Sequence, residues 1–444
     1  MIDVMNKLNE LSNNSGSNTG GSDMPSTSGL EALFMELGYS VPNVLTQAAQ
    51  RGIQLKNNFN PYQGWIDLSL PTFLPTGLDL SQLSNIDVHN ALSWNGYDMP
   101  NYSNSQFRLS NAMGSVTIGN MGTNQILLGF GPLVEYITFR NTIYSQNRYD
   151  GQSCLFNNCG SLSGIEGLAY IDITNHTSLS HAFSGTFNLH NIDGYQNWNT
   201  SNVTSMQGLF SGTAIQSLDL SNWDFSNVYN YNQIFGSTFN LQMLSMPVNF
   251  GCNAQMAQSA FQNCNLSAIS IQGFNPDCSD ISAMFQYCNN LQTVYLPENF
   301  GRSSNELWGF FDQCWNLQNV YGSIDVGNVS PDNWVNALFP RQDWGNGQGQ
   351  YNQIKYMVVK NIGKYEDGMQ RSLEIYAPYW GMDDQSCVWD SLLNYSYDRR
   401  ANGMSDMTIN LYSRVGFGLG EETYTALANK GYIFNYIYLN DEAQ

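Results

Sequence analysis

A phenylalanine recurs at a nearly constant interval through the middle of this chain, and few folds accommodate such a pattern. It is clearest in the stretch AMFQYCNNLQTVYL, at Ala283–Leu296. Successive members lie 24 to 28 residues apart, at Phe130, Phe156, Phe183, Phe210, Phe235, Phe261, Phe285, Phe311 and Phe339. A fixed period of this size indicates a solenoid, in which each repeat is one structural unit.

Each phenylalanine is followed by a short polar run and then by a block of alternating apolar residues. Seven of these Leu-x-x-apolar-x-apolar blocks begin at Leu162, Leu189, Ile215, Leu241, Leu266, Leu291 and Leu317. Alternation with period two predicts one short strand per repeat, with the phenylalanine on the opposite wall. A single repeat is too small to bury its own apolar face, so neighbouring repeats must stack, with their strands about 4.8 Å apart.

The stretch WNTSNVTSMQGLFSGTAIQSLDLSNWDFSNVYNYNQIF, at Trp198–Phe235, resembles the BspA-type leucine-rich repeats of bacterial surface proteins and some bacteriophage proteins. The resemblance covers residues 126–349, and GLGEETYTALANKGYIF, at Gly418–Phe434, looks like the terminal cap of that family. It implies an α/β solenoid of the leucine-rich-repeat kind, built from coils of about 26 residues. Such repeats are used mainly for binding, so the fold alone does not define a function.

Four regions follow from this pattern. We expect a polar N-terminal arm at residues 1–28, a docking region at 29–105, the repeat solenoid at 106–349 and a C-terminal repeat cap at 350–444. The arm is a Ser/Asn/Gly tract, which takes one conformation only where contacts hold it, and the next region is punctuated by prolines. We therefore expect residues 1–105 to dock onto partner proteins and to cap the first coil.

The flanking elements are also predicted from periodicity and helix signals. The first strands of the stack should lie near Phe107–Ser110, Ser115–Ile118 and Val134–Phe139. The cap should contain strands at Ile354–Lys360, Ser372–Ala377, Met407–Ser413 and Tyr432–Leu439, and helices at Gln385–Arg399 and Glu421–Lys430, with Gly431 as the helix stop.

The bulk composition excludes several classes of partner. The formal charge is −20 with only 16 Lys and Arg, which is unsuited to the neutralisation of nucleic-acid phosphates. No stretch approaches 18 consecutive apolar residues, and MIDVMNKLNELSNNSG lacks the basic and apolar segments of a secretory signal. We expect neither nucleic-acid binding nor membrane insertion, and the missing signal counts against an ordinary exported protein.

Catalytic and metal-binding motifs are missing from the sequence. It has no Gly-x-x-x-x-Gly-Lys, His-Glu-x-x-His or Gly-x-Ser-x-Gly, and its four histidines are His89, His176, His181 and His190. Asp193 and Asp219 could pair for glycoside cleavage or bind Ca²⁺, but any stack brings acidic residues in register this close together. We therefore expect a protein that is not an enzyme and that has no cofactor and no metal.

Four of the eight cysteines stand three residues after a repeat phenylalanine, at Cys159, Cys264, Cys288 and Cys314. Equivalent positions point in the same direction, which predicts a ladder of small, buried side chains with free thiols rather than a disulfide framework. Cys154 and Cys159 are the one close pair that could suggest a metal site.

The residues between the inward apolar positions of each strand should face solvent. We name this set the outward row: Glu166, Asp193, Asp219, Ser245, Ser270, Tyr295 and Tyr321. The predicted binding site is its aromatic end, Tyr295 and Tyr321, together with Trp344 and Tyr351 from a loop at Pro340–Asn352. Aromatic rings stack on sugars or fill partner pockets at low entropic cost, although these four residues could instead pack against a neighbouring subunit or the cap.

Two functions of different classes fit the sequence. The first is a structural protein of a tailed bacteriophage virion (tail fibre, baseplate, collar or head decoration) that docks on other virion proteins through residues 1–105. Its repeats would face a host-surface glycan or protein, and we expect it to be a homo-oligomer. The second is a bacterial cell-surface adhesin. The ordered arm, the missing signal and the Lys-poor composition favour the virion.

Overall fold

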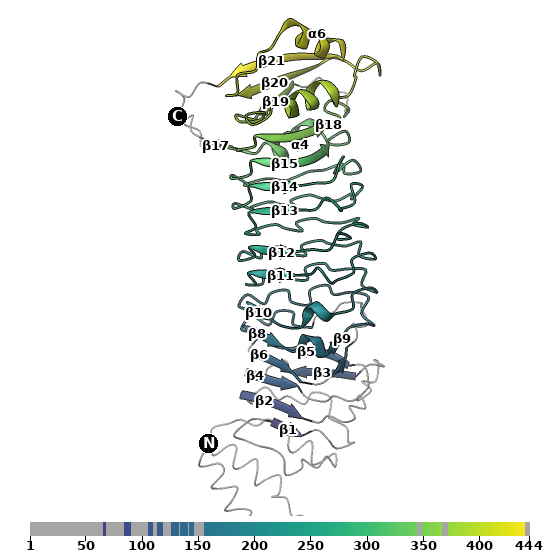
Figure 1. Cartoon of the computed structure of the whole chain (residues 1–444), viewed down its shortest axis with the longest axis vertical. Coiled ribbons are helices and arrows are strands. Elements are labelled where there is room, and N and C mark those ends of the chain that lie inside the picture. Colours follow the sequence, from purple (N-terminus) through teal and green to yellow (C-terminus); the bar gives the residue numbers. More distant parts are fainter. Residues whose placement is uncertain are drawn as a thin grey trace, which may run out of the picture. The chain divides into compact units, whose positions relative to one another are not determined.

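A computed structural model describes most of the chain from residue 126 onward. The described ranges are 65–67, 84–89, 105–109, 113–118, 126–132, 134–140, 142–145, 155–343, 349–365 and 372–439. The chain divides into two compact units, residues 1–202 and 203–444. The described architecture is mixed α/β, with many short parallel strands in small sheets and few helices, and the described α-helices lie in the second unit (Figure 1).

The first unit is organised by one sheet of parallel strands in the order β1-β2-β4-β6-β8-β10. Their bounds are Trp65–Asp67, Ser84–His89, Met113–Ile118, Val134–Phe139, Gly164–Glu166 and Asn191–Ile192. Two parallel pairs accompany the sheet: β3 (Ser105–Leu109) with β5 (Ile126–Phe130), and β7 (Ile143–Tyr144) with β9 (Ile171–Asp172). The three strands predicted at the start of the stack correspond to β3, β4 and β6. The unit also has two 3₁₀ turns, η1 at Leu168–Tyr170 and η2 at Tyr195–Asn197.

The second unit continues the same kind of pairing. Strand β11 (Ser217–Asp219) pairs with β12 (Met243–Ser245). A four-stranded parallel sheet follows in the order β13 (Ala268–Ser270), β14 (Thr293–Tyr295), β15 (Asn319–Asp325) and β18 (Tyr356–Lys360). The alternating pattern explains the register, because the central apolar residues Ile269, Val294 and Val320 are partners of one another and all three are buried.

The recurring phenylalanines are buried as predicted. None of the nine is more than 9% exposed. In the first unit the rings of Phe130 and Phe156 stack with centroids 5.5 Å apart, and those of Phe156 and Phe183 with centroids 5.2 Å apart. In the second unit the stack runs through Phe210, Phe235, Phe261, Phe285 and Phe311 at centroid distances of 5.9, 5.4, 5.5 and 5.7 Å.

A second hydrogen-bond ladder runs along the phenylalanine wall. Backbone amides of one repeat donate to carbonyls of the next, for example Phe235 N to Ala260 O and Phe261 N to Met284 O, both 2.9 Å. Residues two positions before and two after the phenylalanines take positive φ: His181, Gly208, Gln233, Ser259, Ala283 and Gly309 before, and Asn158, Gly185, Gly212, Ser237, Asn263, Tyr287 and Gln313 after. Most of these residues are not glycine. The hydrogen bonds of the strands and of the phenylalanine wall therefore hold the backbone in a turn that residues with a side chain disfavour.

Replacing a glycine at these turns should therefore lower the stability more than replacing a glycine elsewhere. Gly309 has φ of 67°, and the nearest atom that an added Cβ would meet is Nε2 of Gln286, at 3.1 Å. We expect Gly309→Ala to lower the free energy of unfolding by about 1 kcal/mol, because left-handed strain exceeds the chain entropy saved. Gly416→Ala is the matched control, since Gly416 has no positive φ and open space at its Cβ. Equal urea midpoints for the two variants would contradict the expectation.

The cysteine ladder has the predicted arrangement. Cys159, Cys264, Cys288 and Cys314 are all buried. The thiols of Cys264, Cys288 and Cys314 donate to the carbonyls of Phe235, Phe261 and Phe285 in the preceding repeats, at 3.2, 3.0 and 2.9 Å. Burial raises the pKa of the Cys159 thiol to about 12, and it raises that of Cys264 and Cys288 as well. The seven cysteines of the described part carry free thiols, and Cys154 lies outside it.

The C-terminal part contains three parallel strands in the order β19-β20-β21, at Ser372–Tyr376, Met407–Ser413 and Tyr432–Tyr438. Helix α6 (Glu421–Asn429) ends before Gly431, whose φ is 88°, as the sequence predicts. The expected helix at Gln385–Arg399 is wrong in length: α5 spans Ser386–Trp389, and a π-helical turn, η3 (Asp390–Asn394), ends it. Beyond that turn the backbone of Tyr395 and Tyr397 bonds to Asn361 and Ile362, and these contacts replace helical ones.

In the second unit, a helix and a hairpin were not expected. Helix α4 (Pro331–Leu338) precedes the last phenylalanine of the series. The segment predicted as a loop, Pro340–Asn352, forms an antiparallel hairpin of β16 (Arg341–Asp343) and β17 (Gly349–Tyr351) instead. Nearly all of the proposed N-terminal arm and docking region lies outside the described residues, and the four predicted regions stay a prediction.

Candidate functional site

The outward row faces solvent along its whole length. All seven members, from Glu166 to Tyr321, are exposed, whereas the apolar residues that precede them in the strands are buried or half-buried. Within the second unit the row is in register over two stretches, because Asp219 pairs with Ser245 in the first, and Ser270 pairs with Tyr295 and Tyr295 with Tyr321 in the second. The alternation of each short strand therefore places polar and aromatic side chains side by side within each stretch.

The aromatic end of this row is a ladder of three tyrosines. The rings of Tyr295 and Tyr321 are stacked, with centroids 5.0 Å apart and an interplanar angle of 21°. Tyr356 of β18, which the sequence reasoning missed, covers the other face of Tyr321 at 5.3 Å. Tyr295 and Tyr321 are 37% and 38% exposed. Both faces of Tyr321 are therefore occupied, and this ring offers a ligand only its edge and hydroxyl group.

A β-bulge explains how Tyr356 joins the ladder. The register between β15 and β18 shifts between Val320 and Ser323, and Gly322 lies in the shifted segment with φ of 88°. A Cβ at Gly322 would come within 2.2 Å of the Leu296 carbonyl oxygen, so only glycine fits. Tyr356 is the register partner of Asn319 rather than of Tyr321, and simple alternation of the sequence does not reveal their contact.

The two other predicted binding residues are Tyr351 and Trp344, and the structure describes only Tyr351. Tyr351 is half-buried in β17 and pairs with Arg341 across the hairpin. No ring contact joins Tyr351 to the three ladder tyrosines among the residues with described side chains. Trp344 lies outside the described residues. Of the four predicted residues the structure brings Tyr295 and Tyr321 together and adds Tyr356, whereas the part of Trp344 in the site stays a prediction.

The acidic end of the row holds hydrogen-bonded carboxylates. Tyr136 donates to Glu166 at 2.8 Å, and burial together with Glu166 raises the pKa of this tyrosine. Hydrogen bonds from the side chain and backbone of Ser221 lower the pKa of Asp219. A general acid for glycoside cleavage needs a raised carboxyl pKa, so nothing at Asp219 favours that reaction.

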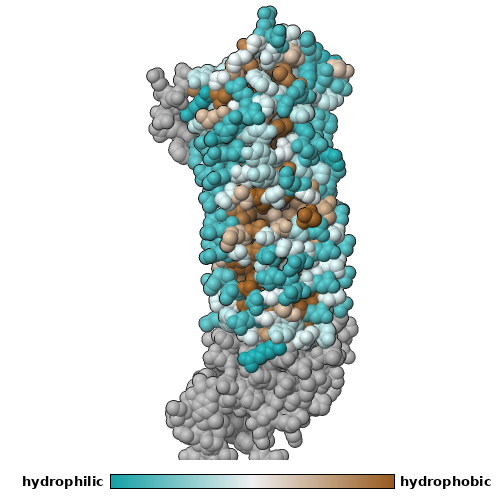
Figure 2. Space-filling view, in the orientation of Figure 1, coloured by the Kyte–Doolittle hydropathy of each residue, from teal (hydrophilic) through white to brown (hydrophobic). Residues whose placement is uncertain are grey.

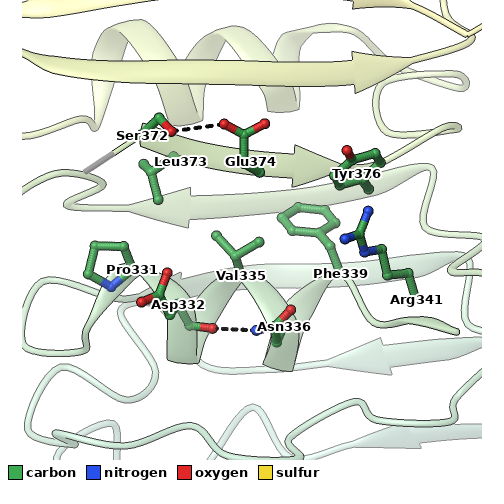
Figure 3. A pocket seen from close by; sticks show the side chains of 10 residues that line it. All are labelled: Pro331, Asp332, Val335, Asn336, Phe339, Arg341, Ser372, Leu373, Glu374 and Tyr376. Carbon is green, nitrogen blue, oxygen red and sulfur yellow. Dashed lines mark hydrogen bonds between the residues drawn. The ribbon is translucent and has the colours of Figure 1, made fainter. Parts of the chain in front are cut away.

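A pocket lies between helix α4 and strand β19 (Figure 3). Its volume is about 120 Å³, and its walls combine the apolar side chains of Val335, Phe339 and Leu373 with several polar ones. The Arg341 guanidinium lies 4.0 Å from the centroid of the Tyr376 ring. Known small-molecule sites are several times larger, so this pocket suits at most a very small ligand.

Glu374, which lines this pocket together with a second carboxylate, Asp332, is held in a hydrogen-bond network. It accepts hydrogen bonds from Ser372 at 2.9 Å and from Asn410 at 2.6 Å. Burial acts to raise the pKa of Glu374, but these hydrogen bonds outweigh it and lower the pKa. Glu374 therefore acts as a charged acceptor of structural hydrogen bonds.

The described histidines are separated from one another. His176 is buried and shares a 3.0 Å hydrogen bond with Ser145, His181 is half-buried and His190 is exposed. The described part of the chain contains no group of three His, Cys, Asp or Glu side chains placed to hold a metal ion. None of its helices has the length and apolarity needed to cross a membrane.

Comparison with known proteins gives one partial match. A family model described as "Mycoplasma protein of unknown function, DUF285" matches residues 152–274, and this family is related to BspA-like repeats. The matched range contains five of the recurring phenylalanines and the stretch Trp198–Phe235. No curated protein and no solved structure matches the chain.

Proposed function

We propose that this chain is a binding protein whose repeats form one leucine-rich-repeat-like solenoid and present the outward row to a partner. The observation that carries the proposal is the solvent exposure of all seven outward positions beside buried neighbours. A regular surface of this kind offers many weak contacts over a long distance, which is how other repeat proteins bind. In the described part, the carboxylates are engaged in hydrogen bonds and the pocket is small, which favours binding over catalysis.

Within this function, the tyrosine ladder is the preferred contact site. Its rings are preorganised, because each stacks on the next and loses little conformational freedom when a partner binds. The face of Tyr295 opposite Tyr321 is directed toward Ser270, a small residue, so a sugar ring or an apolar side chain can pack there. The three tyrosine hydroxyl groups can form hydrogen bonds with the same ligand at the edge of the ladder.

We further propose that the chain is a structural protein of a bacteriophage virion, anchored to other virion proteins through residues 1–105 and facing the host surface with its repeats. The low content of Lys and Arg and the polar N-terminal composition support this placement. A bacterial cell-surface adhesin is the second candidate. The family match favours it, since that family model is described for a Mycoplasma protein.

The double variant Tyr295→Ser/Tyr321→Ser tests the contact site. We expect particles that carry it to assemble normally but to adsorb to host cells at least about tenfold less well, because aromatic contact residues commonly contribute more than 1 kcal/mol. Tyr229→Ser/Tyr424→Ser is the matched control, since both of these tyrosines are 40% exposed and lie off the ladder.

Three outcomes separate the alternatives. If the double variant adsorbs normally, the tyrosine ladder does not take part in host binding. Failed assembly would make the ladder a joint between subunits. If the chain is absent from purified particles but present on intact bacterial cells, the protein is a cell-surface adhesin and not a virion protein.

A further inference from the structure

The repeat that contains β12 carries three apolar side chains where solvent-facing residues are expected. Phe239 precedes the strand, Met243 begins it and Val248 lies in the turn after it, and we call this set the β12 stripe. They are 62%, 64% and 97% exposed. Figure 2 shows apolar surface gathered across the displayed face around this level of the second unit.

Other repeats place small or polar residues at these positions, but Phe187, which is 69% exposed, and Trp315 also stand where Phe239 does. Asn265 and Asn289 stand where Phe239 does, four residues after the phenylalanine of their repeats. Ala268 and Thr293 are the first residues of their strands, as Met243 is of β12. The segments MPVNFG (246–251) and LPENFG (296–301) align directly, so Val248 corresponds to Glu298. The fold therefore does not require apolar residues in the stripe.

The strand ladder of the second unit is interrupted beside the stripe. Strand β12 pairs with β11, and β13 begins the next sheet, with no described backbone hydrogen bond between β12 and β13. Leu244, the inward residue of β12, is half-buried, whereas Leu218 and Val294 at the same position are 1% and 0% exposed. The interruption leaves part of Leu244 uncovered, which adds to the apolar surface.

The surroundings of the stripe carry only negative charge. Between Arg148 and Arg302 the sequence has no Lys or Arg and nine Asp or Glu. Two of these acids adjoin the stripe: Asp219 is the register partner of Ser245, and Asp224 accepts a hydrogen bond from Asn249 at 2.9 Å. Hydrogen bonds from Ser221 and Ser226 lower the pKa of these two carboxyls, so both are ionised at neutral pH.

We propose that the β12 stripe is a docking surface for a protein segment that presents apolar side chains flanked by Lys or Arg. The exposed apolar residues would supply the buried contact, and the acidic surroundings would select and orient a cationic partner. A second copy of this stretch does not fit, because its own carboxylates would repel those of the first. The inference stands apart from the tyrosine ladder and from any virion placement.

A synthetic peptide of alternating leucine and lysine, labelled for fluorescence anisotropy, serves as the probe with the full chain. We expect it to bind, and to bind more weakly at high salt because the carboxylates are solvent-exposed. Phe239→Asn/Met243→Thr copies the neighbouring repeats and should weaken binding at least about tenfold. Ile433→Thr, which removes a 53% exposed apolar side chain of β21, should leave the affinity unchanged.

Two further peptides decide the chemistry. A serine and lysine peptide should bind at least about tenfold more weakly, and a leucine and glutamate peptide should not bind. The proposal is overturned if the leucine and lysine peptide does not bind, or if it binds the double variant as tightly as the natural chain. It is also overturned if either comparison peptide binds the natural chain with the same affinity as the leucine and lysine peptide. Backbone hydrogen exchange of the double variant should match that of the natural chain, because the substituted side chains are solvent-exposed.

Discussion

Replacing Phe261 by alanine is expected to lower the free energy of unfolding by about 3–5 kcal/mol. Phe261 is 1% exposed, and its ring stacks between those of Phe235 and Phe285 with centroid distances of 5.4 and 5.5 Å. Truncation would leave a cavity in a row of rings that the hydrogen-bond ladders hold at fixed spacing, so the site has little freedom to collapse. Hydrogen exchange of the second unit measures the loss locally.

Phe239→Ala is the matched control for this experiment. It removes the same side chain from a neighbouring repeat, at a position that is 62% exposed, and should change stability by less than about 0.5 kcal/mol. A loss below 1 kcal/mol for Phe261→Ala would mean that the phenylalanine row does not form the core.

Acid is expected to destabilise the first unit through His176. Burial lowers the pKa of this imidazole to about 4, although Ser178 and Asp172 act to raise it. In the unfolded chain the ordinary value is about 6.5. Between these two values the unfolded state binds more protons than the folded state, so stability falls as the pH drops from about 6.5 to about 4. The difference between the two pKa values corresponds to a loss of about 3 kcal/mol in the free energy of unfolding.

The measurement compares the natural chain with His176→Asn, which cannot titrate at this position. Unfolding free energies of the first unit, from hydrogen exchange at several pH values, should fall by about 3 kcal/mol more in the natural chain. Titrating carboxylates are common to both proteins and cancel. His190→Asn changes an exposed histidine of the same unit and should follow the natural profile. Parallel profiles for the natural chain and His176→Asn would refute the assignment.

Much of the local architecture could be predicted from sequence because it depends on short periods. The spacing of the phenylalanines and the alternation within each Leu block place side chains such as Phe261, Val294 and Tyr295 on the correct face without knowledge of distant contacts. Strands Met407–Ser413 and Tyr432–Tyr438 were recognisable for the same reason.

Several features that escaped prediction depend on contacts between distant segments. The helix after Ser386 is shortened by backbone bonding of Tyr395 and Tyr397 to Asn361 and Ile362. The hairpin at Arg341–Tyr351 pairs locally, and its Arg341 contacts the Tyr376 ring of β19. The tyrosine ladder needed the bulge at Gly322 and the ring of Tyr356, so rings expected to be open platforms cover one another. The exposure of Met243 and Val248 could have been suspected, since they interrupt columns of polar residues.

Cross-linking tests most directly the proposal that the repeats form one solenoid. In a single stack, residues 193 and 219 would be neighbours about 4.8 Å apart, a spacing that a disulfide can bridge. Asp193→Cys/Asp219→Cys should therefore oxidise to an intramolecular disulfide as readily as Asp219→Cys/Ser245→Cys, whose positions are register partners. Asp193→Cys/Ser245→Cys, two steps and about 10 Å apart, should not. Failure of the first pair while the register pair cross-links would contradict a continuous row.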